Sequence, residues 1–288
     1  MTTQVQTPRV HRANVGNFEL TILTDGSYWL DGGAMFGVVP KPMWSKRIAA
    51  DEQNRITLGL NSLLIRGGEK TVLVETGIGP KMGEKQRQIF GNKAALLHSF
   101  ETLQLSPGAI DIVINTHLHF DHCGWNTYYR DGRAVPTFPR AMYYTQRGEW
   151  EHAQEQHDRD RVSYISDNYN PLIDSGQMTL LQGDAEIIPG IRVEVFPGHT
   201  RNLQAVIIES EGKTACYPSD LIPTSHHLDP TWVMGYDLDP IACIDNRKKF
   251  YDIAIPNGWL VAFTHDHEHP FAYVERDERG RPVPRYVE

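Results

Sequence analysis

The stretch that decides the fold is Thr116-His117-Leu118-His119-Phe120-Asp121-His122-Cys123-Gly124. Three imidazoles and one carboxylate lie within six residues, directly after the apolar run 112–115. Imidazole nitrogen and carboxylate oxygen are the ligands that zinc and similar divalent ions prefer. In open α/β sheets, ligands gather just beyond the ends of strands. The stretch therefore predicts a metal site on a loop that leaves a strand.

Composition and charge exclude several classes of protein. The chain of 288 residues is 40% hydrophobic and 22% charged, and its net charge of −8 argues against nucleic acid as a partner. Its three cysteines include no C-x-x-C pair, which excludes a disulfide framework and fits a reducing compartment. No apolar run is long enough to span a membrane, and residues 1–8 lack the apolar core of a secretory signal. A cytoplasmic protein with no membrane partner is predicted.

The apolar pattern predicts a mixed order of strands and helices. Asp25-Gly26 is predicted as a turn after the first strand. With no internal repeat and no low-complexity linker, residues 1–288 are expected to form a single domain. Strands are predicted at 18–23, 60–65, 71–74, 112–115, 141–144, 178–181, 187–196, 203–209, 214–217, 259–263 and 271–274. Helices are predicted at 81–90, 93–103, 146–156, 161–173 and 244–255.

Two segments outside the clearest elements bear on function. Residues 26–59 interrupt large apolar side chains with glycine and proline. They are interpreted as a lid-like loop that covers either the body of the protein or a substrate pocket. The strongly charged segment 155–161 is interpreted as a solvated connection between two helices.

Metal-capable side chains follow four different predicted strands. The cluster 117–122 follows one strand, and His199, Asp220 and His265 each follow another. Rigid strands that end in ligands give a metallohydrolase its fixed geometry. Seven ligands are too many for one tetrahedral ion but suit two, and a carboxylate such as Asp220 can bridge them.

Together these motifs resemble the metallo-β-lactamase-fold hydrolase superfamily. The matching elements are the cluster 117–122, Pro197-Gly198-His199-Thr200, Ser219-Asp220 and Thr264-His265-Asp266, in that order. The chain is most similar to the lactonase-like branch, which includes acyl-homoserine-lactone lactonases and related organophosphate hydrolases. The resemblance implies an α/β (α+β) fold, a four-layer αβ/βα sandwich with two mixed sheets back to back and helices outside.

The resemblance also implies the cofactors and their ligands. Two divalent metal ions are expected, usually zinc, with iron, cobalt and manganese as the alternatives. Asp220 is the residue that bridges them. A homodimer is implied as well, since lactonases of this type are often dimers. Carried over residue by residue, the ligands are His117, His119 and His199 for one ion, and Asp121, His122 and His265 for the other.

Two positions depart from the family pattern. Glu75 stands where family members usually carry aspartate in a D-T-G turn. The longer carboxylate is still able to support a ligand, but its geometry is open. Pro223 stands where many homoserine-lactone lactonases carry a tyrosine, three residues after the bridging aspartate. This departure weakens the assignment of that particular substrate, although it leaves the chemistry unchanged.

The expected reaction is hydrolysis of an ester, foremost a lactone, by a metal-bridged hydroxide. Asp121 and Asp220 are the candidates for passing the proton. One alternative is a phosphotriester or aryl-ester hydrolase that uses the same site. Another is a non-hydrolytic metal-binding or di-iron redox protein.

Substrate choice is assigned to side chains outside the ligand set. Core packing is the alternative role for the four apolar candidates named below, and a position in a solvated loop is the alternative for His226. The small-molecule ester or lactone is expected to contact Trp29, Met35, Phe36, His226 and Trp232.

Overall fold

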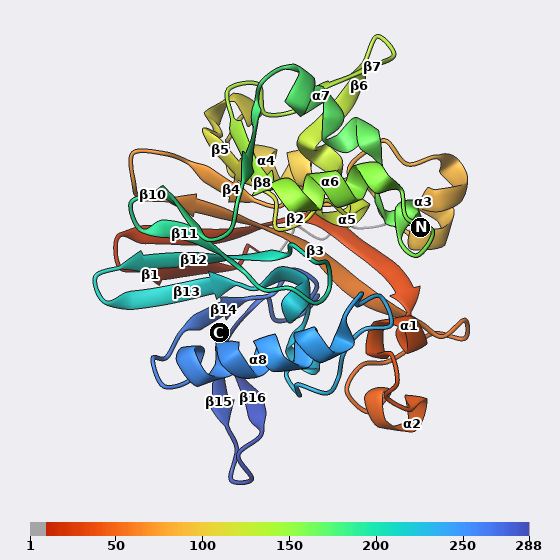
Figure 1. The fold of residues 1–288 in the computed structure, drawn as a ribbon, viewed down its shortest axis with the longest axis vertical. Helices are drawn as coiled ribbons and strands as arrows, with labels where there is room; N and C mark the ends of the chain where they lie inside the picture. The colour runs from red at the N-terminus through yellow and green to blue at the C-terminus, as the bar shows by residue number, and fades with distance from the viewer. Residues whose placement is uncertain (1–9, 288) are drawn as a thin grey trace.

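The computed structural model describes residues 10–287, and within them two seven-stranded sheets form the centre of the molecule (Figure 1). The first sheet has the order β1-β2-β3-β4-β5-β8-β9. Its strands are Arg12–Val15, Phe18–Asp31, Arg55–Arg66, Val72–Val74, Ile112–Ile114, Met142–Gln146 and Met178–Leu181. The second sheet runs from β10 to β16 in chain order. Its strands are Ala185–Ile188, Ile191–Val195, Gln204–Ser210, Lys213–Tyr217, Leu260–Ala262, Phe271–Arg276 and Pro282–Tyr286.

Helices cover the outer faces of both sheets. Side chains of α4 (Leu96–Thr102), α6 (Arg147–Glu155) and α7 (Asn170–Asp174) share an apolar cluster with the first sheet. Side chains of α8 (Pro240–Ala254) share another cluster with the second sheet. The order helix, sheet, sheet, helix is the αβ/βα sandwich, so the predicted fold class is confirmed (Figure 1).

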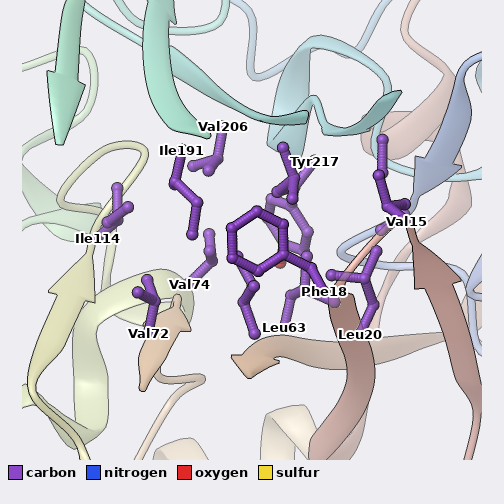
Figure 2. Packing of buried hydrophobic residues seen from close by; sticks show 14 of the residues in the cluster. Val15, Phe18, Leu20, Leu63, Val72, Val74, Ile114, Ile191, Val206 and Tyr217 are labelled. Atoms are coloured by element: carbon purple, nitrogen blue, oxygen red, sulfur yellow. The ribbon is translucent and has the colours of Figure 1, made fainter. Parts of the chain in front are cut away.

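A third apolar cluster holds the two sheets together (Figure 2). Leu63 and Val74 of the first sheet meet Val206 and Tyr217 of the second, and all of them are fully buried. Successive strand residues point to opposite faces, so Leu64 beside Leu63 packs against the outer helices instead. Burial of each such side chain stabilises the fold by about 1.5–3 kcal/mol.

The predicted turn at Asp25-Gly26 is wrong, because β2 continues through it to Asp31. The strand register shifts between Thr24 and Ser27, which marks a bulge. The buried carboxylate of Asp25 accepts hydrogen bonds from the backbone N–H groups of Ile78, Gly79 and Leu96 and from the indole of Trp125. Asp25 therefore joins three distant segments and does not reverse the chain.

Other boundaries also differ from the prediction. The expected helix 161–173 is two short 3-10 turns and then α7, since Pro171 allows a helix to begin there but not to pass through. The expected strand 187–196 is the pair β10 and β11, which turns at Gly190 with φ of 84°. No strand was predicted between residues 115 and 141, but β6 (Thr127–Arg130) and β7 (Arg133–Pro136) form a hairpin there. Edge strands β1 and β16 had no predicted counterpart.

The segment 26–59 is more regular than a loop. Strands β2 and β3 stay paired as far as Asp31 and Arg55, and the connection contains α1 (Gly32–Phe36) and α2 (Lys41–Trp44). Two further short helices are α3 (Glu84–Phe90) and α5 (Phe120–Cys123), and α5 contains Asp121 and His122 of the histidine cluster. No helix among residues 10–287 is long and apolar enough to cross a membrane. Residues 1–8, used above to argue against a secretory signal, lie outside the described residues.

Candidate metal centre

All seven predicted ligands lie just beyond the ends of strands that reach one region of the molecule. Strand β5 of the first sheet leads into the cluster 117–122. Strands β11, β13 and β14 of the second sheet lead to His199, Asp220 and His265. The side chain of Asp121 is 12% exposed, and the other six residues are buried.

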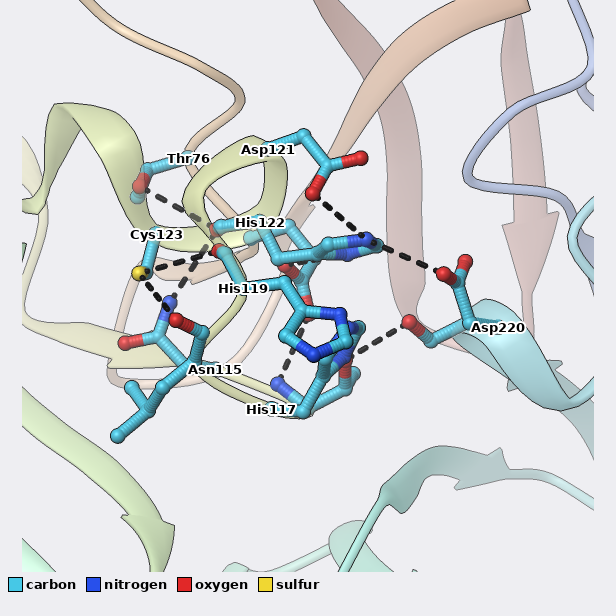
Figure 3. Close-up of polar contacts among 12 residues, drawn as sticks. Thr76, Asn115, His117, His119, Asp121, His122, Cys123 and Asp220 are labelled. Atoms are coloured by element: carbon cyan, nitrogen blue, oxygen red, sulfur yellow. Dashed lines mark hydrogen bonds and ion pairs between the residues drawn. The ribbon is translucent and has the colours of Figure 1, made fainter. Parts of the chain in front are cut away.

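The ligand atoms form two groups, which we call the first and second trio. Within each trio, one donor atom per residue lies within 4.8 Å of the others. These are the two sets that the family resemblance implies. Figure 3 shows the cluster 117–122 facing Asp220, which comes from another strand end. The first trio is His117, His119 and His199, and the second is Asp121, His122 and His265.

Asp220 lies between the two trios. Its Oδ2 is 3.2 Å from His199 Nε2, which belongs to the first trio. Its Oδ1 is 3.2 Å from His265 Nε2, which belongs to the second. Oδ2 also lies 3.5 Å from His122 Nε2 of the second trio. The carboxylate therefore contacts both trios, which is the placement that a bridging ligand needs.

A third combination, Glu75 with His117 and His122, also brings donor atoms within 4.8 Å. Glu75 lies behind His122, however: its Oε2 is 3.1 Å from His122 Nδ1, and its Oε1 accepts a hydrogen bond from Thr116 N at 2.8 Å. Glu75 is therefore placed to orient the ring of His122 and leave Nε2 for an ion. The backbone of Glu75 has a positive φ of 66°, and the glutamate side chain reaches His122 from this conformation.

Other partners orient two more rings, those of His199 and His265, in the same way. Asp237 Oδ1 is 3.0 Å from His199 Nδ1, and the carbonyl of Gly59 is 2.9 Å from His265 Nδ1. Each contact occupies the nitrogen that faces away from Asp220. The carbonyl of Pro223 accepts a hydrogen bond from the His265 backbone N–H at 2.9 Å, so the residue that replaces the lactonase tyrosine supports a ligand through its main chain.

Glu149 on α6 supports the first trio, and no sequence pattern indicated this role. Its fully buried carboxylate accepts hydrogen bonds from Leu118 N at 3.1 Å and from Thr200 Oγ1 at 2.7 Å. Leu118 lies between two ligands of the first trio, and Thr200 follows the third. One carboxylate therefore joins both loops that form this trio.

Unpaired buried atoms test whether the residues fit metal ions. Within residues 10–287, Nε2 of His117, Nε2 of His122 and Oδ1 of Asp220 are buried without a hydrogen-bond partner. Buried polar atoms normally have partners, and an ion is an accepted reason for an exception. Nitrogen and oxygen donors of this kind suit zinc and related divalent ions. The residues therefore fit the two ions that the family implies.

The protonation of the site agrees with this fit. Burial lowers the pKa of His117 and His119 well below the usual histidine value, which keeps both rings neutral, as ligands must be. Burial acts on His122 in the same direction, but the carboxylates of Asp220, Asp121 and Glu75 raise its pKa well above the usual value. These carboxylates thus require a nearby positive charge, which metal ions would supply in place of the proton.

A cavity of about 230 Å³ opens beside the trios. Of the predicted substrate contacts, Met35 lines it. A larger open cavity of about 920 Å³ beside β6 and β7 contains none of the ligands. The site cavity is lined by Tyr28, Leu30, Met35, Phe90, His119, Phe120, Asp121, Arg159, Asp160, Val162, Ser163, His199, Asp220, Met234, Tyr236 and His265.

The other predicted contacts lie elsewhere. Phe36 is fully buried and stacks on His227, and Trp232 is buried beneath the guanidinium of Arg47. Trp29 is 37% exposed and lies under Arg55. His226 lines a second cavity of about 290 Å³, which has His265 in common with the site cavity.

The segment 155–161 corrects the sequence interpretation in one respect. Although most of it is exposed, Arg159 and Asp160 line the site cavity, so this segment is not only a solvated connection. Arg159 donates a hydrogen bond to the carbonyl of Gly235 at 2.5 Å. That bond joins the segment to the opposite wall of the cavity.

A family model described as the metallo-beta-lactamase superfamily matches residues 56–269. The chain belongs to the metallo-beta-lactamase superfamily. The match includes every ligand from His117 to His265, so the superfamily and the geometry point to the same site.

Curated relatives within the superfamily are N-acyl homoserine lactonases. The lactonase of Bacillus thuringiensis is 24% identical over 215 residues, which cover 74% of this chain and 73% of that protein. A lactonase from a Bacillus species is 28% identical over 216 residues, with the same coverage of 74% and 73%.

Solved structures share the superfamily fold. A probable metal-dependent hydrolase from Staphylococcus aureus has a TM-score of 0.87 at 30% identity and covers 96% of this chain and 100% of its own. AidC, a dizinc quorum-quenching lactonase in complex with a product, has a TM-score of 0.80 at 20% identity. The match covers 97% of this chain and 98% of AidC, and it shows a shared fold alone. Superfamily membership and the buried histidine and aspartate groups identify the chain as a metal-dependent hydrolase.

Proposed function

We propose that the chain hydrolyses esters, with lactones as the leading substrates, by means of two divalent cations, foremost zinc. The position of Asp220 carries the proposal, because this one carboxylate lies 3.2 Å from an imidazole nitrogen of each trio. The lactonase relatives, at 24% and 28% identity, support the substrate class.

In this mechanism the first trio would hold one ion, the second trio would hold the other, and Asp220 would be the ligand shared by both. Two such cations, when bound, polarise the substrate oxygen and lower the pKa of water toward neutrality. Leu30, Met35 and Phe90 form an apolar wall of the cavity that seats the substrate and keeps bulk water away.

The two aspartates differ as carriers of the proton. Burial raises the pKa of Asp220, but the imidazoles of His122, His265 and His199 hold it well below the usual range, so this carboxylate stays ionised. Asp121 lines the cavity and is 12% exposed. Of the two, we assign proton transfer to Asp121 and bridging to Asp220.

Metal removal tests the proposal directly. Chelation should abolish the opening of a lactone panel, and zinc should restore it. His117→Ala should lose activity with or without added zinc. Full lactone opening by the metal-free protein would contradict the proposal.

The substrate and the metal need separate measurements. A parallel phosphotriester and aryl-ester panel distinguishes the alternative hydrolase, which would turn over those compounds faster than any lactone. Elemental analysis distinguishes the di-iron redox protein, which would contain two irons per chain and open no lactone. A homodimer and a cytoplasmic location stay predictions.

A further inference from the structure

Tyr28 is a buried aromatic residue in the wall of the site cavity. It lies on β2 beyond the register shift, pairs with Leu58 of β3, and is 1% exposed. Its ring lies against His265, with ring centroids 5.4 Å apart, and packs into an apolar cluster. Phenylalanine would fill the same space, and a buried hydroxyl costs free energy unless it is hydrogen-bonded. The hydroxyl therefore needs a reason beyond packing.

The hydroxyl of Tyr28 reaches the second trio. Its Oη donates a hydrogen bond to Asp121 Oδ2 at 2.9 Å. It also lies 3.4 Å from each ring nitrogen of His265. Tyr28 thus contacts two of the three members of the second trio. Tyrosine is not among the usual ligands of zinc, so Tyr28 is not counted as a ligand itself.

This bond gives the two oxygens of Asp121 different environments. Oδ2 accepts the phenol and lies 3.7 Å from His265 Nε2. Oδ1 lies 3.7 Å from His122 Nε2, the atom that is buried without a hydrogen-bond partner. A carboxylate whose second oxygen is held by a donor is fixed in orientation and offers mainly one oxygen to an ion.

We propose that Tyr28 is a positioning residue that holds Asp121 as a one-oxygen ligand and thereby sets the affinity of the second trio for its ion. The inference rests on the proposed two-metal site. Tyr28 acts through Asp121, so its loss is expected to change metal affinity first and the rate of hydrolysis only as a consequence.

The test compares Tyr28→Phe with Tyr251→Phe. Tyr251 is also a buried phenol, but its hydroxyl donates to the carbonyl of Leu228 at 2.7 Å, within the cluster beneath α8. Both variants and the wild type are freed of metal and titrated with Zn²⁺ against a chromophoric chelator. In Tyr28→Phe we expect one of the two equivalents to bind about 10–100-fold more weakly and the other to be unchanged. Tyr251→Phe should match the wild type for both.

Cobalt(II) provides a second readout, because its visible absorption reports coordination. The spectrum of the weakened Co²⁺ equivalent should change in Tyr28→Phe, and both spectra should stay unchanged in Tyr251→Phe. Equal second-site affinity in wild type and Tyr28→Phe would overturn the inference. So would an activity loss in Tyr28→Phe that persists when excess zinc has filled both sites, since a positioning role predicts recovery.

The same experiment keeps the two proposals distinct. A wild-type chain that binds two zinc ions but opens no ester overturns the proposed function, while the affinity comparison still decides the role of Tyr28. A wild-type chain that binds only one equivalent overturns both.

Discussion

The two trios face each other across Asp220, but different groups support them. Buried carboxylates support the first trio: Asp237 contacts the ring of His199, and Glu149 joins the two ligand loops. The first trio itself consists of imidazoles alone. The negative charge near the first trio therefore belongs to the carboxylates around it and not to its own members.

The second trio contains its own carboxylate, and two of its supports are neutral. Tyr28 donates to Asp121, and the carbonyl of Gly59 contacts His265, while Glu75 is the one acidic support, at His122. The comparison teaches that the two trios are fixed differently: buried carboxylates support the first, whereas two neutral groups and one buried carboxylate support the second. Substitutions that act on one trio, the other, or both should therefore separate the two ions.

Removal of the shared ligand should have the largest effect. Asp220→Ala deletes the oxygens that face both trios, and we expect ester hydrolysis to fall by at least about 10³-fold with fewer than two metal ions bound per chain. Elemental analysis and lactone hydrolysis measure both. Asp245→Ala, at a side chain on α8 that is 71% exposed, is the control and should be unchanged. Two bound ions and full activity in Asp220→Ala would show that the trios do not share a ligand.

Loss of Glu149 should affect only the first trio. Glu149→Ala leaves the buried N–H of Leu118 without its acceptor, at a cost of about 1–3 kcal/mol of stability. It should also weaken one zinc equivalent by about 10–100-fold, with the second unchanged. Glu155→Ala on the same helix, at a side chain that is 60% exposed, is the matched control. Equal weakening of both equivalents would mean that Glu149 supports the fold in general.

The sequence predicted the ligand set because its signal is local. Each ligand directly follows an apolar strand, and the strand ends meet at one place in the fold. Glu75 was expected as a support from the family resemblance. Tyr28 and Glu149 were missed as supports because their contacts are far apart in the chain: Tyr28 and Asp121 are separated by 93 residues. Glu149 occupies an ordinary position in a polar helix, and only the packing of α6 on the first sheet reveals its buried partners.

Asp25 shows why a local signal also misled. Asp-Gly favours a turn in isolation, but in the fold this carboxylate accepts hydrogen bonds from Ile78, Leu96 and Trp125. Those partners come from segments whose positions depend on the whole first sheet. The bulge in β2 lets the strand continue past Asp25 to Tyr28, where the predicted turn would have ended it.

Acid should weaken the wall of the cavity behind Met35. Burial, with the nearby Arg247 guanidinium, lowers the pKa of His227 to about 3, and its Nε2 lies 2.9 Å from the carbonyl of Met35. Because the pKa of His227 in the folded state lies below the usual 6.5, lowering the pH from 7 to 5 protonates His227 in the unfolded chain but not in the folded chain. The free energy of unfolding should therefore fall by about 2 kcal/mol more in wild type than in His227→Gln between pH 7 and pH 5. Urea unfolding of the metal-free proteins measures the difference, and parallel pH profiles would contradict it.

The smallest expected effect concerns the substrate and separates two residues of the segment 26–59. Met35 lines the cavity beside Asp121 and His265 of the second trio, whereas Trp29 lies under Arg55 outside that cavity. Met35→Ala should lower kcat/KM for a long-acyl lactone by about 10-fold, because apolar contact with the substrate is lost. It should leave the shortest lactone nearly unchanged, and Trp29→Ala should change neither. The reverse result, with Trp29→Ala selective for long-acyl substrates and Met35→Ala neutral, would place the acyl chain outside the cavity and restore Trp29 as a substrate contact.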